Sequence, residues 1–428
     1  MKIIKYLVPA LLFIITITNC SCFGPVDSDP HLPTKPYIAA TVTGFYNHPL
    51  QSILATVNNK SVYTDMFGNF SFRDLNDVFD VNINDPVREY NIIYKDVTMC
   101  DSRIHLPLSS NQNADTYTIN VLFPTIQYPE KGKLYYISNS RFVTAQNIDS
   151  SSTIVFQCPI WNYPRGRVVF ISYTTDNEGK INAYKYYGES EEVSPKTGGF
   201  DTIQFSASQI QTVGSKQYTC SIIPPIGSSI ININLVFNFN FGYYYTKKAF
   251  ADINSQTIEK YSGNNFTLLL PTSFNPHDFK PLLNITTNGV NGYTEEMKLF
   301  PSGSSGDFNL TGAPRVTSPP DYAVNVDSST VFSIQKQNIS NVLIFTLIDS
   351  IAGKSYNLCT SDSSITMSML SKMVSLTPNK TYSYTVQQIG VNIKNVTDYL
   401  KDFDNLADYK GTTPVRHFTT KPQLIQSK

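Results

Sequence analysis

Residues 61–72 read Ser-Val-Tyr-Thr-Asp-Met-Phe-Gly-Asn-Phe-Ser-Phe, and this stretch decides the kind of fold that the chain adopts. Its opening residues favour a strand, because branched and aromatic side chains pack well on a pleated sheet. Asp65 and Gly68 fit the first and fourth positions of a type I turn, where aspartate accepts backbone hydrogen bonds and glycine tolerates a positive φ. Phe70 and Phe72 are two residues apart, so both side chains point to one face. We therefore predict a tight turn between two strand segments, with Asp65 and Gly68 as its structural residues and with Phe70 and Phe72 in a core.

Together with the residues before it, this turn gives the segment a family resemblance. The pattern Thr64-Asp65-x-x-Gly68-x-Phe70-x-Phe72, with Val42-x-Gly44 and Pro49-Leu50 before it, resembles the carboxypeptidase regulatory-like domain. The resemblance covers residues 37–107 and implies a small antiparallel β-sandwich of the transthyretin type. It also implies a folding and spacing module, because this domain is the non-catalytic companion of the peptidase.

The composition extends the β prediction to the whole chain. Charged residues make up 15% of the 428 residues and aromatic residues 13%, with 27 Tyr, 26 Phe and one Trp; typical soluble proteins carry about 25% charged residues. We predict an all-β chain of tandem β-sandwich domains of Ig-like, transthyretin-like and fibronectin type III-like kinds, since its length exceeds one ordinary core. Lys plus Arg equals Asp plus Glu, at 33 each, so no net charge attracts nucleic acid.

The first 22 residues have the layout of a secretory signal. Lys2 and Lys5 precede a short apolar run, and small residues with two cysteines follow. This end resembles the acylation site of bacterial lipoproteins, and the resemblance implies lipidation at Cys20, with Cys22 as the alternative. The proline-rich residues 23–36 are predicted to form an extended linker.

Two further β domains are expected in the middle of the chain, at 113–195 and 200–310. The boundary between them is placed at the composition shift of residues 194–199. The alternation of Ile231 to Tyr245 predicts a long half-buried strand, or two strands with a bend. Cys158 and Cys220 are the pair that could share a module or a junction, and a disulfide and buried free thiols both fit.

Residues 314–421 resemble a fibronectin type III domain. The run Leu376-x-Pro-x-x-x-Tyr382 is similar to the corner before the penultimate strand of that family, which implies Leu376 in the core and a Tyr382 hydroxyl bonded back to the backbone. Apolar residues recur at helical spacing from Val396 to Leu406, with Asn395 as the N-cap. We expect this short helical insertion to pack on the edge of the same sandwich.

The sequence contains no recognisable catalytic, metal or cofactor motif. The five histidines lack zinc-protease spacing, and no nucleophile elbow or complete phosphate loop occurs. Trp161 and Tyr163 are the weak ligand candidates, because an exposed Trp beside a Tyr can stack on a sugar.

We therefore expect a bacterial envelope lipoprotein that is exported to the outer membrane or cell surface and held by its N-terminal lipid. It would present β-sandwich modules for adhesion or for binding an envelope complex, with protein or glycan partners and no enzyme activity. The alternatives are a carbohydrate-binding lipoprotein of a polysaccharide-capture system and an envelope hydrolase with its site in the middle region.

Overall fold

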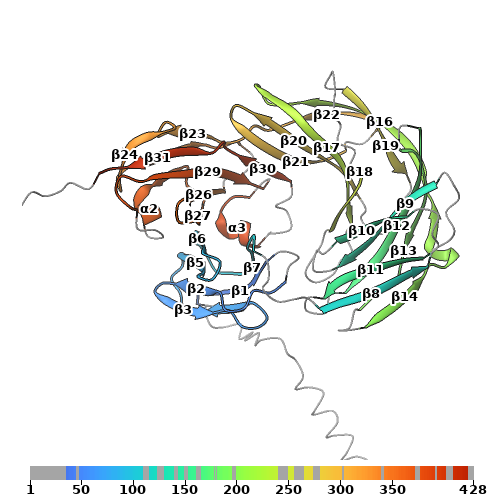
Figure 1. Cartoon of the computed structure of the whole chain (residues 1–428), viewed down its shortest axis with the longest axis horizontal. Helices are drawn as coiled ribbons and strands as arrows, with labels where there is room; N and C mark the ends of the chain where they lie inside the picture. The colour runs from blue at the N-terminus through green and yellow to red at the C-terminus, as the bar shows by residue number, and fades with distance from the viewer. Residues whose placement is uncertain are drawn as a thin grey trace, which may run out of the picture. The chain divides into compact units, whose positions relative to one another are not determined.

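The computed structural model describes the greater part of the chain after residue 34, as strands joined by turns (Figure 1). The described residues are 35–44, 48–108, 115–122, 130–138, 143–148, 153–160, 165–177, 179, 181–194, 199–239, 249–254, 265–272, 280–300, 303–338, 342–371, 376–390, 393–401 and 408–422. The prediction of an all-β chain of tandem sandwiches is confirmed by the strand pairing. None of the helices in these ranges is long and apolar enough to cross a membrane.

The first domain is a sandwich of two sheets. One sheet has the order β4 (Asn69–Phe72), β1 (Ile38–Thr43) and β7 (Cys100–His105). The other has the order β6 (Tyr90–Val97), β5 (Phe79–Asp85), β2 (Leu54–Val57) and β3 (Lys60–Tyr63). Alternate residues of β1 and β5 are buried between the sheets, as the period of two along a strand requires.

The second domain is also a sandwich, but it ends later than the sequence suggests. One sheet has the order β10 (Val143–Ile148), β9 (Glu130–Ser138), β12 (Gly166–Thr175), β13 (Ile181–Glu189) and β15 (Ile210–Thr212). The other has the order β11 (Thr153–Ile160), β8 (Asp115–Leu122) and β14 (Phe200–Gln204), and the 3-10 helix η2 (Ala207–Gln209) precedes β15. The boundary expected at 194–199 therefore has to be corrected, because β14 pairs with β8 and β15 pairs with β13.

The third domain follows at once. One sheet has the order β19 (Asn265–Thr272), β16 (Gly214–Ile223) and β22 (Ser305–Asn309). The other begins with β18 (Ala249–Asn254), β17 (Ser228–Phe239), β20 (Lys280–Gly289) and β21 (Gly292–Leu299). Residues 231–239 of the long alternating stretch lie in β17, whose register against β20 shifts between Ile230 and Asn232, and residues 240–245 lie outside the described residues.

The last domain completes the series of sandwiches. Its smaller sheet has the order β23 (Arg315–Ser318), β25 (Val331–Gln335) and β28 (Ser364–Thr366). The larger sheet comprises β31 (Arg416–Thr420), β29 (Thr381–Ile389), β26 (Leu343–Asp349) and β27 (Lys354–Thr360), with β24 (Ala323–Val326) beside β31 and β30 (Tyr409–Thr412) beside β29. The helices α2 (Met367–Ser371) and α3 (Val396–Lys401) connect its strands.

The sheet of the last domain continues into its neighbours on both sides. β21 of the third domain pairs with β30, and β6 of the first domain pairs in parallel with β27, from Tyr90 opposite Ser355 to Tyr94 opposite Cys359. These pairings join 14 strands among the described residues. The first and last domains of the chain are thus joined by backbone hydrogen bonds.

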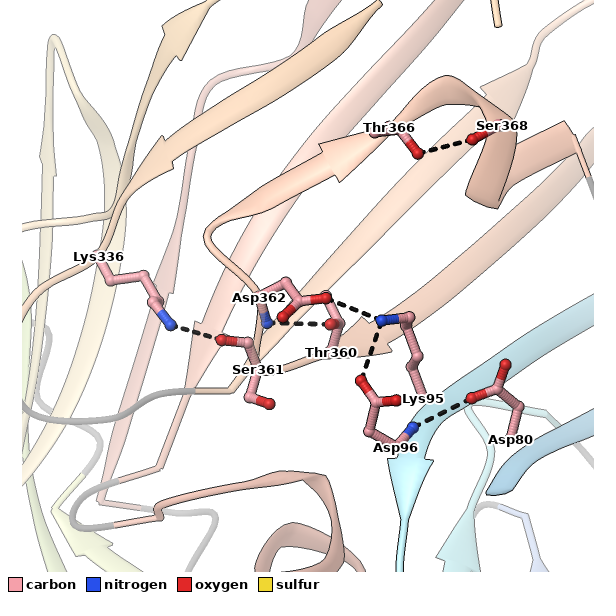
Figure 2. A network of polar contacts seen from close by, with 9 residues as sticks. All are labelled: Asp80, Lys95, Asp96, Lys336, Thr360, Ser361, Asp362, Thr366 and Ser368. Atoms are coloured by element: carbon pink, nitrogen blue, oxygen red, sulfur yellow. Dashed lines mark hydrogen bonds and ion pairs between the residues drawn. The ribbon is translucent and has the colours of Figure 1, made fainter. Parts of the chain in front are cut away.

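Polar side chains cross the junction between the first and last domains (Figure 2). The Lys95 ammonium lies between the carboxylates of Asp362, at 2.9 Å, and Asp96, at 3.0 Å. Burial lowers the pKa of Lys95, but its hydrogen bonds to the two carboxylates outweigh this and raise it above the ordinary value. Because these groups are partly exposed, such a pair contributes less than about 1 kcal/mol, so the junction depends mainly on the strand pairing and on apolar packing.

The helix α3 supplies that packing, and its position corrects the expectation that it lies on the edge of its own sandwich. Val396 and Leu400 are one turn apart on one face and are buried in the core of the first domain. The Thr397 hydroxyl accepts the Thr98 backbone N–H at 2.8 Å. The Asn395 side chain accepts the Asp398 N–H at 2.8 Å and so caps the helix, as the sequence predicts.

Candidate binding surface

Residues 60–67 of the first domain carry the best candidate for a functional surface. They comprise the strand β3, which is exposed along its whole length, and the beginning of the turn that follows. β3 pairs with β2 on one side and ends the sheet among the described residues. Its other edge presents backbone groups that can pair with another strand.

The turn after β3 is held by Asp65. Its Oδ1 accepts the backbone N–H groups of Phe67, at 2.9 Å, and of Asn69, at 2.8 Å. The Gly68 N–H donates to the Asp65 carbonyl at 2.9 Å, which closes the four-residue turn. Asp65 therefore serves the turn, and its Oδ1 is already engaged in two hydrogen bonds.

Gly68 allows the turn to lie close against β1. Its φ is +76°, a value that side chains disfavour, and a Cβ there would stand 2.4 Å from the Val42 carbonyl oxygen. The Val42 N–H donates to the Gly68 carbonyl at 2.8 Å. Only glycine gives this close approach without displacing the backbone.

Thr64 lies inside the exposed stretch, next to Asp65, and anchors it. Its side chain is buried, donates to the Leu50 carbonyl at 2.6 Å and accepts the Ile53 N–H at 3.0 Å. The backbone of residues 63–65 therefore has little freedom, because the buried threonine and the Asp65 turn directly after it both hold it.

Large apolar side chains project from this fixed backbone. Tyr63 is 61% exposed, Met66 64% and Phe67 52%. An aromatic side chain or methionine held in place before binding loses little entropy when a partner covers it, and such residues are enriched in protein interfaces. We call residues 60–67 the first-domain surface.

Phe70 and Phe72 follow the turn in β4 and belong to the core of the first domain. Both side chains are buried, and their rings meet edge to face with centroids 5.9 Å apart. The two phenylalanines thus fix β4, the strand that begins directly after the turn, in the core.

Leu376 and Tyr382 lie in the last domain. Tyr382 is buried, and its hydroxyl accepts the Thr377 N–H at 3.0 Å, a bond from the side chain back to the start of the corner. Leu376 is half-buried and packs against the core of this domain. The other sequence candidates, Cys20, Cys22, Trp161 and Tyr163, lie outside the described residues.

The described cysteines are poor nucleophiles. Cys100, Cys220 and Cys359 are buried free thiols. Burial raises the pKa of Cys100 to about 11 and that of Cys220 to about 12, so the reactive thiolate is scarce at neutral pH. Cys158 lies in β11, and its side chain is outside the described part of the chain. Within the described ranges, no group of three His, Cys, Asp or Glu residues could hold a metal ion.

The sequence contained a signal for the first-domain surface that the composition obscured. Met66 and Phe67 occupy the two central positions of the turn, between Asp65 and Gly68, and central turn positions face solvent. Apolar residues are ordinarily counted toward a core, so the sequence predicts the turn but not the exposure of Met66 and Phe67.

Comparison with known proteins gives no family for the chain. No family model and no curated protein matches it. Among solved structures, it is similar to the Bacillus anthracis TIE protein, with 12% identity, 65% of this chain and 50% of that one covered and a TM-score of 0.17. The chain thus spans half the length of that protein.

Two further solved structures show the same level of likeness. The fimbrial anchor protein Mfa2 from Porphyromonas gingivalis has 9% identity, with 40% and 78% of the two chains covered and a TM-score of 0.18. The FN1-FN3 domains of chicken CNTN1 have 10% identity, with 80% and 94% covered and a TM-score of 0.18. At these TM-scores the likenesses carry no argument, and the fold rests on the strand pairing alone.

Proposed function

We propose that the chain is a non-catalytic cell-envelope lipoprotein that presents β-sandwich modules for adhesion or for binding an envelope complex. The observation that carries this proposal is the first-domain surface: Tyr63, Met66 and Phe67 are exposed on a backbone fixed by Thr64 and the Asp65 turn. Exposed apolar groups of this size on a rigid support are a feature of interaction sites.

Two properties of this surface favour a protein partner. The apolar side chains provide the contact area, and the open edge of β3 provides backbone donors and acceptors for a strand of the partner. The junction with the last domain uses β6, at the opposite end of the first-domain sheet from β3, so the two attachments do not compete.

The surface can be tested by adhesion of chain-coated beads to the cell envelope of the host bacterium and to its target cells. We expect Met66→Asp together with Phe67→Asp to reduce bead retention at least tenfold, because the charges would have to be buried in the interface. The control is Val87→Asp, which places a charge at a residue of the same domain that is 76% exposed. Equal retention of both variants, or no retention of the unmodified chain, would reject the proposal.

The lipid anchor is part of the proposal and has its own test. A charged start, a short apolar run and Cys20 or Cys22 support acylation and export to the outer membrane or cell surface. We expect Cys20→Ser to move the chain from the membrane fraction to the soluble fraction and Cys22→Ser to leave it bound. The mass of the N-terminal peptide would show which cysteine carries the lipid, and a chain without any acyl group would overturn this part.

We also propose that the first domain is a carboxypeptidase regulatory-like domain. The Asp65 turn, the glycine at position 68 and the two buried phenylalanines support it. Under this assignment the first domain spaces and presents the surface and performs no hydrolysis.

A further inference from the structure

A tyrosine of the last domain has a backbone conformation that its side chain disfavours. Tyr322 directly precedes β24, its φ is +59° and its side chain is 69% exposed. A bulky residue with positive φ is a true outlier, and such strain persists only where the surroundings impose it. Strained residues of this kind concentrate at sites that hold a ligand, so this one requires an explanation.

The surroundings of Tyr322 impose the strain through three hydrogen bonds. The Tyr322 N–H donates to the His417 carbonyl at 2.8 Å. The Asp321 Oδ1 accepts the His417 N–H at 2.7 Å and the Tyr322 N–H at 3.0 Å. The turn is therefore tied to the first residues of β31, and Tyr322 cannot relax without breaking these bonds.

The same arrangement fixes the plane of the tyrosine ring. The Tyr322 and His417 rings are stacked, with centroids 4.8 Å apart and planes 11° from parallel. One face of the tyrosine ring is thus covered by the imidazole, and the high exposure of the side chain leaves the other face to solvent. A flat aromatic face held at a fixed angle is a stacking platform.

The platform has a hydrogen-bond acceptor at its edge. The Asp321 side chain is partly exposed, and its Oδ1 is directed to the two backbone N–H groups. Its Oδ2 has no hydrogen bond within the described part of the chain, so it can accept hydroxyl groups from a molecule stacked on Tyr322. Ser383 lies opposite His417 on β29 and adds a hydroxyl to the same region of the sheet.

We infer that Tyr322 and Asp321 form a carbohydrate-binding platform on the last domain. The apolar C–H face of a pyranose ring would lie on the free face of Tyr322, where the partly positive hydrogens meet the negative face of the ring. The sugar hydroxyls would donate to Asp321. No covalent step is involved.

A sugar fits this platform better than a nucleic acid. A base could also stack on Tyr322, but its phosphates would approach the Asp321 carboxylate. The chain has no net charge to offset that repulsion.

The inference concerns a different domain from the first-domain surface and stands without it. The chain with Met66→Asp and Phe67→Asp should bind sugar as well as the unmodified chain does. Loss of adhesion through the first domain and loss of sugar binding through Tyr322 are therefore separate results.

The test is electrophoresis of the purified chain in native gels that contain hydroxyethyl cellulose, galactomannan or xylan, which are all polymers of pyranose sugars. We expect at least one polymer to retard the unmodified chain. Tyr322→Gly should weaken that retardation at least tenfold, and Tyr322→Phe, which keeps the ring, should preserve most of it. Asp321→Asn should weaken it less than Tyr322→Gly does.

The matched control is Val324→Ala, because Val324 is 68% exposed and lies two residues away. It should leave retardation unchanged. Tyr322→Gly should also keep the Tm at or above that of the unmodified chain, since glycine adopts a positive φ freely. The inference is overturned if no polymer retards the chain, if Tyr322→Gly binds normally, or if Tyr322→Gly unfolds the last domain.

Discussion

Replacing Tyr382 by phenylalanine tests whether one hydroxyl fixes the corner of the last domain. Tyr382 and Tyr384 lie two residues apart in β29, and both side chains are buried. The Tyr382 hydroxyl accepts the Thr377 N–H at 3.0 Å. The Tyr384 hydroxyl interacts with the nearby Arg416 guanidinium, but it makes no hydrogen bond of regular geometry among the described residues and none to the backbone of the corner. Tyr384→Phe is therefore a control with the same change of atoms in the same strand.

The expected loss of stability depends on whether the Thr377 N–H finds another hydrogen-bond partner after the substitution. A net hydrogen bond contributes about 1 kcal/mol, and a buried donor left without a partner costs about 1–3 kcal/mol. Thr377 is an exposed residue, so water can reach its N–H in part. We expect Tyr382→Phe to cost about 1–1.5 kcal/mol, which is roughly a five- to tenfold change in the local opening equilibrium.

Tyr384→Phe should behave differently because the hydroxyl that it removes makes no hydrogen bond to the backbone of the corner. Burial raises the pKa of Tyr384 to about 12, although the nearby Arg416 guanidinium opposes the shift. The hydroxyl is thus desolvated, and its loss should change stability by less than about 0.5 kcal/mol or increase it.

Hydrogen exchange of the peptide 376–390 is the appropriate assay, because a chain of several domains does not unfold in one step. We expect faster exchange in this peptide for Tyr382→Phe and unchanged exchange for Tyr384→Phe. If both variants accelerate exchange equally, packing of the rings and not the hydroxyl holds the corner, and the reasoning fails.

Three further predictions concern other parts of the molecule. Leu400→Ala should lower the free energy of unfolding by about 2–5 kcal/mol, because the side chain is buried, and should speed hydrogen exchange in β6 and β7 of the first domain. The control is Lys401→Ala, an exposed neighbour that should not change this exchange. Exchange changes confined to the last domain would contradict the position of α3. Gly68→Ala should lower the free energy of unfolding, measured by thermal melts, by about 2–3 kcal/mol. Gly353→Ala should lower it less, because Gly353 has a positive φ but open space around the added Cβ. Equal losses would show that the close approach of Gly68 to β1 is unimportant. Burial raises the pKa of Glu296 in spite of the Lys298 ammonium, so the folded state binds this proton more tightly and loses stability as the pH rises from about 4.5 through the raised pKa. Glu296→Gln should therefore reduce the dependence of the Tm on pH in this range. An unchanged dependence would assign it to other groups.

Local features of the chain were predictable from the sequence because they depend on neighbouring residues. The Asp65 turn follows from the preferences of aspartate and glycine at fixed positions, and the start of α3 follows from Asn395 before an apolar stripe. The alternation in β1 gives its buried face directly.

Features that depend on distant partners were not predictable in the same way. The pairing of β6 with β27 joins residues 265 positions apart, from Tyr90 to Ser355, and no local pattern marks a strand edge for a particular partner. The same holds for the end of the second domain. Residues 194–199 have the composition of a linker, but the strand that follows them returns to β8.

The strained Tyr322 was also beyond local prediction. Tyrosine is not a residue that suggests positive φ, and the hydrogen bonds that impose it come from His417, 95 positions later. A site held together in this way becomes visible only when the two segments are seen side by side.

The parallel pairing of β6 with β27 has a consequence for how the chain is made. At about 5–20 residues per second, a ribosome needs roughly 13–53 s to travel from Tyr90 to Ser355. During this interval the nascent first domain lacks Val396 and Leu400 from its core and leaves the edge of β6 without its neighbour. We expect this intermediate to be the species that attracts chaperones, and chains truncated before residue 354 to aggregate through β6.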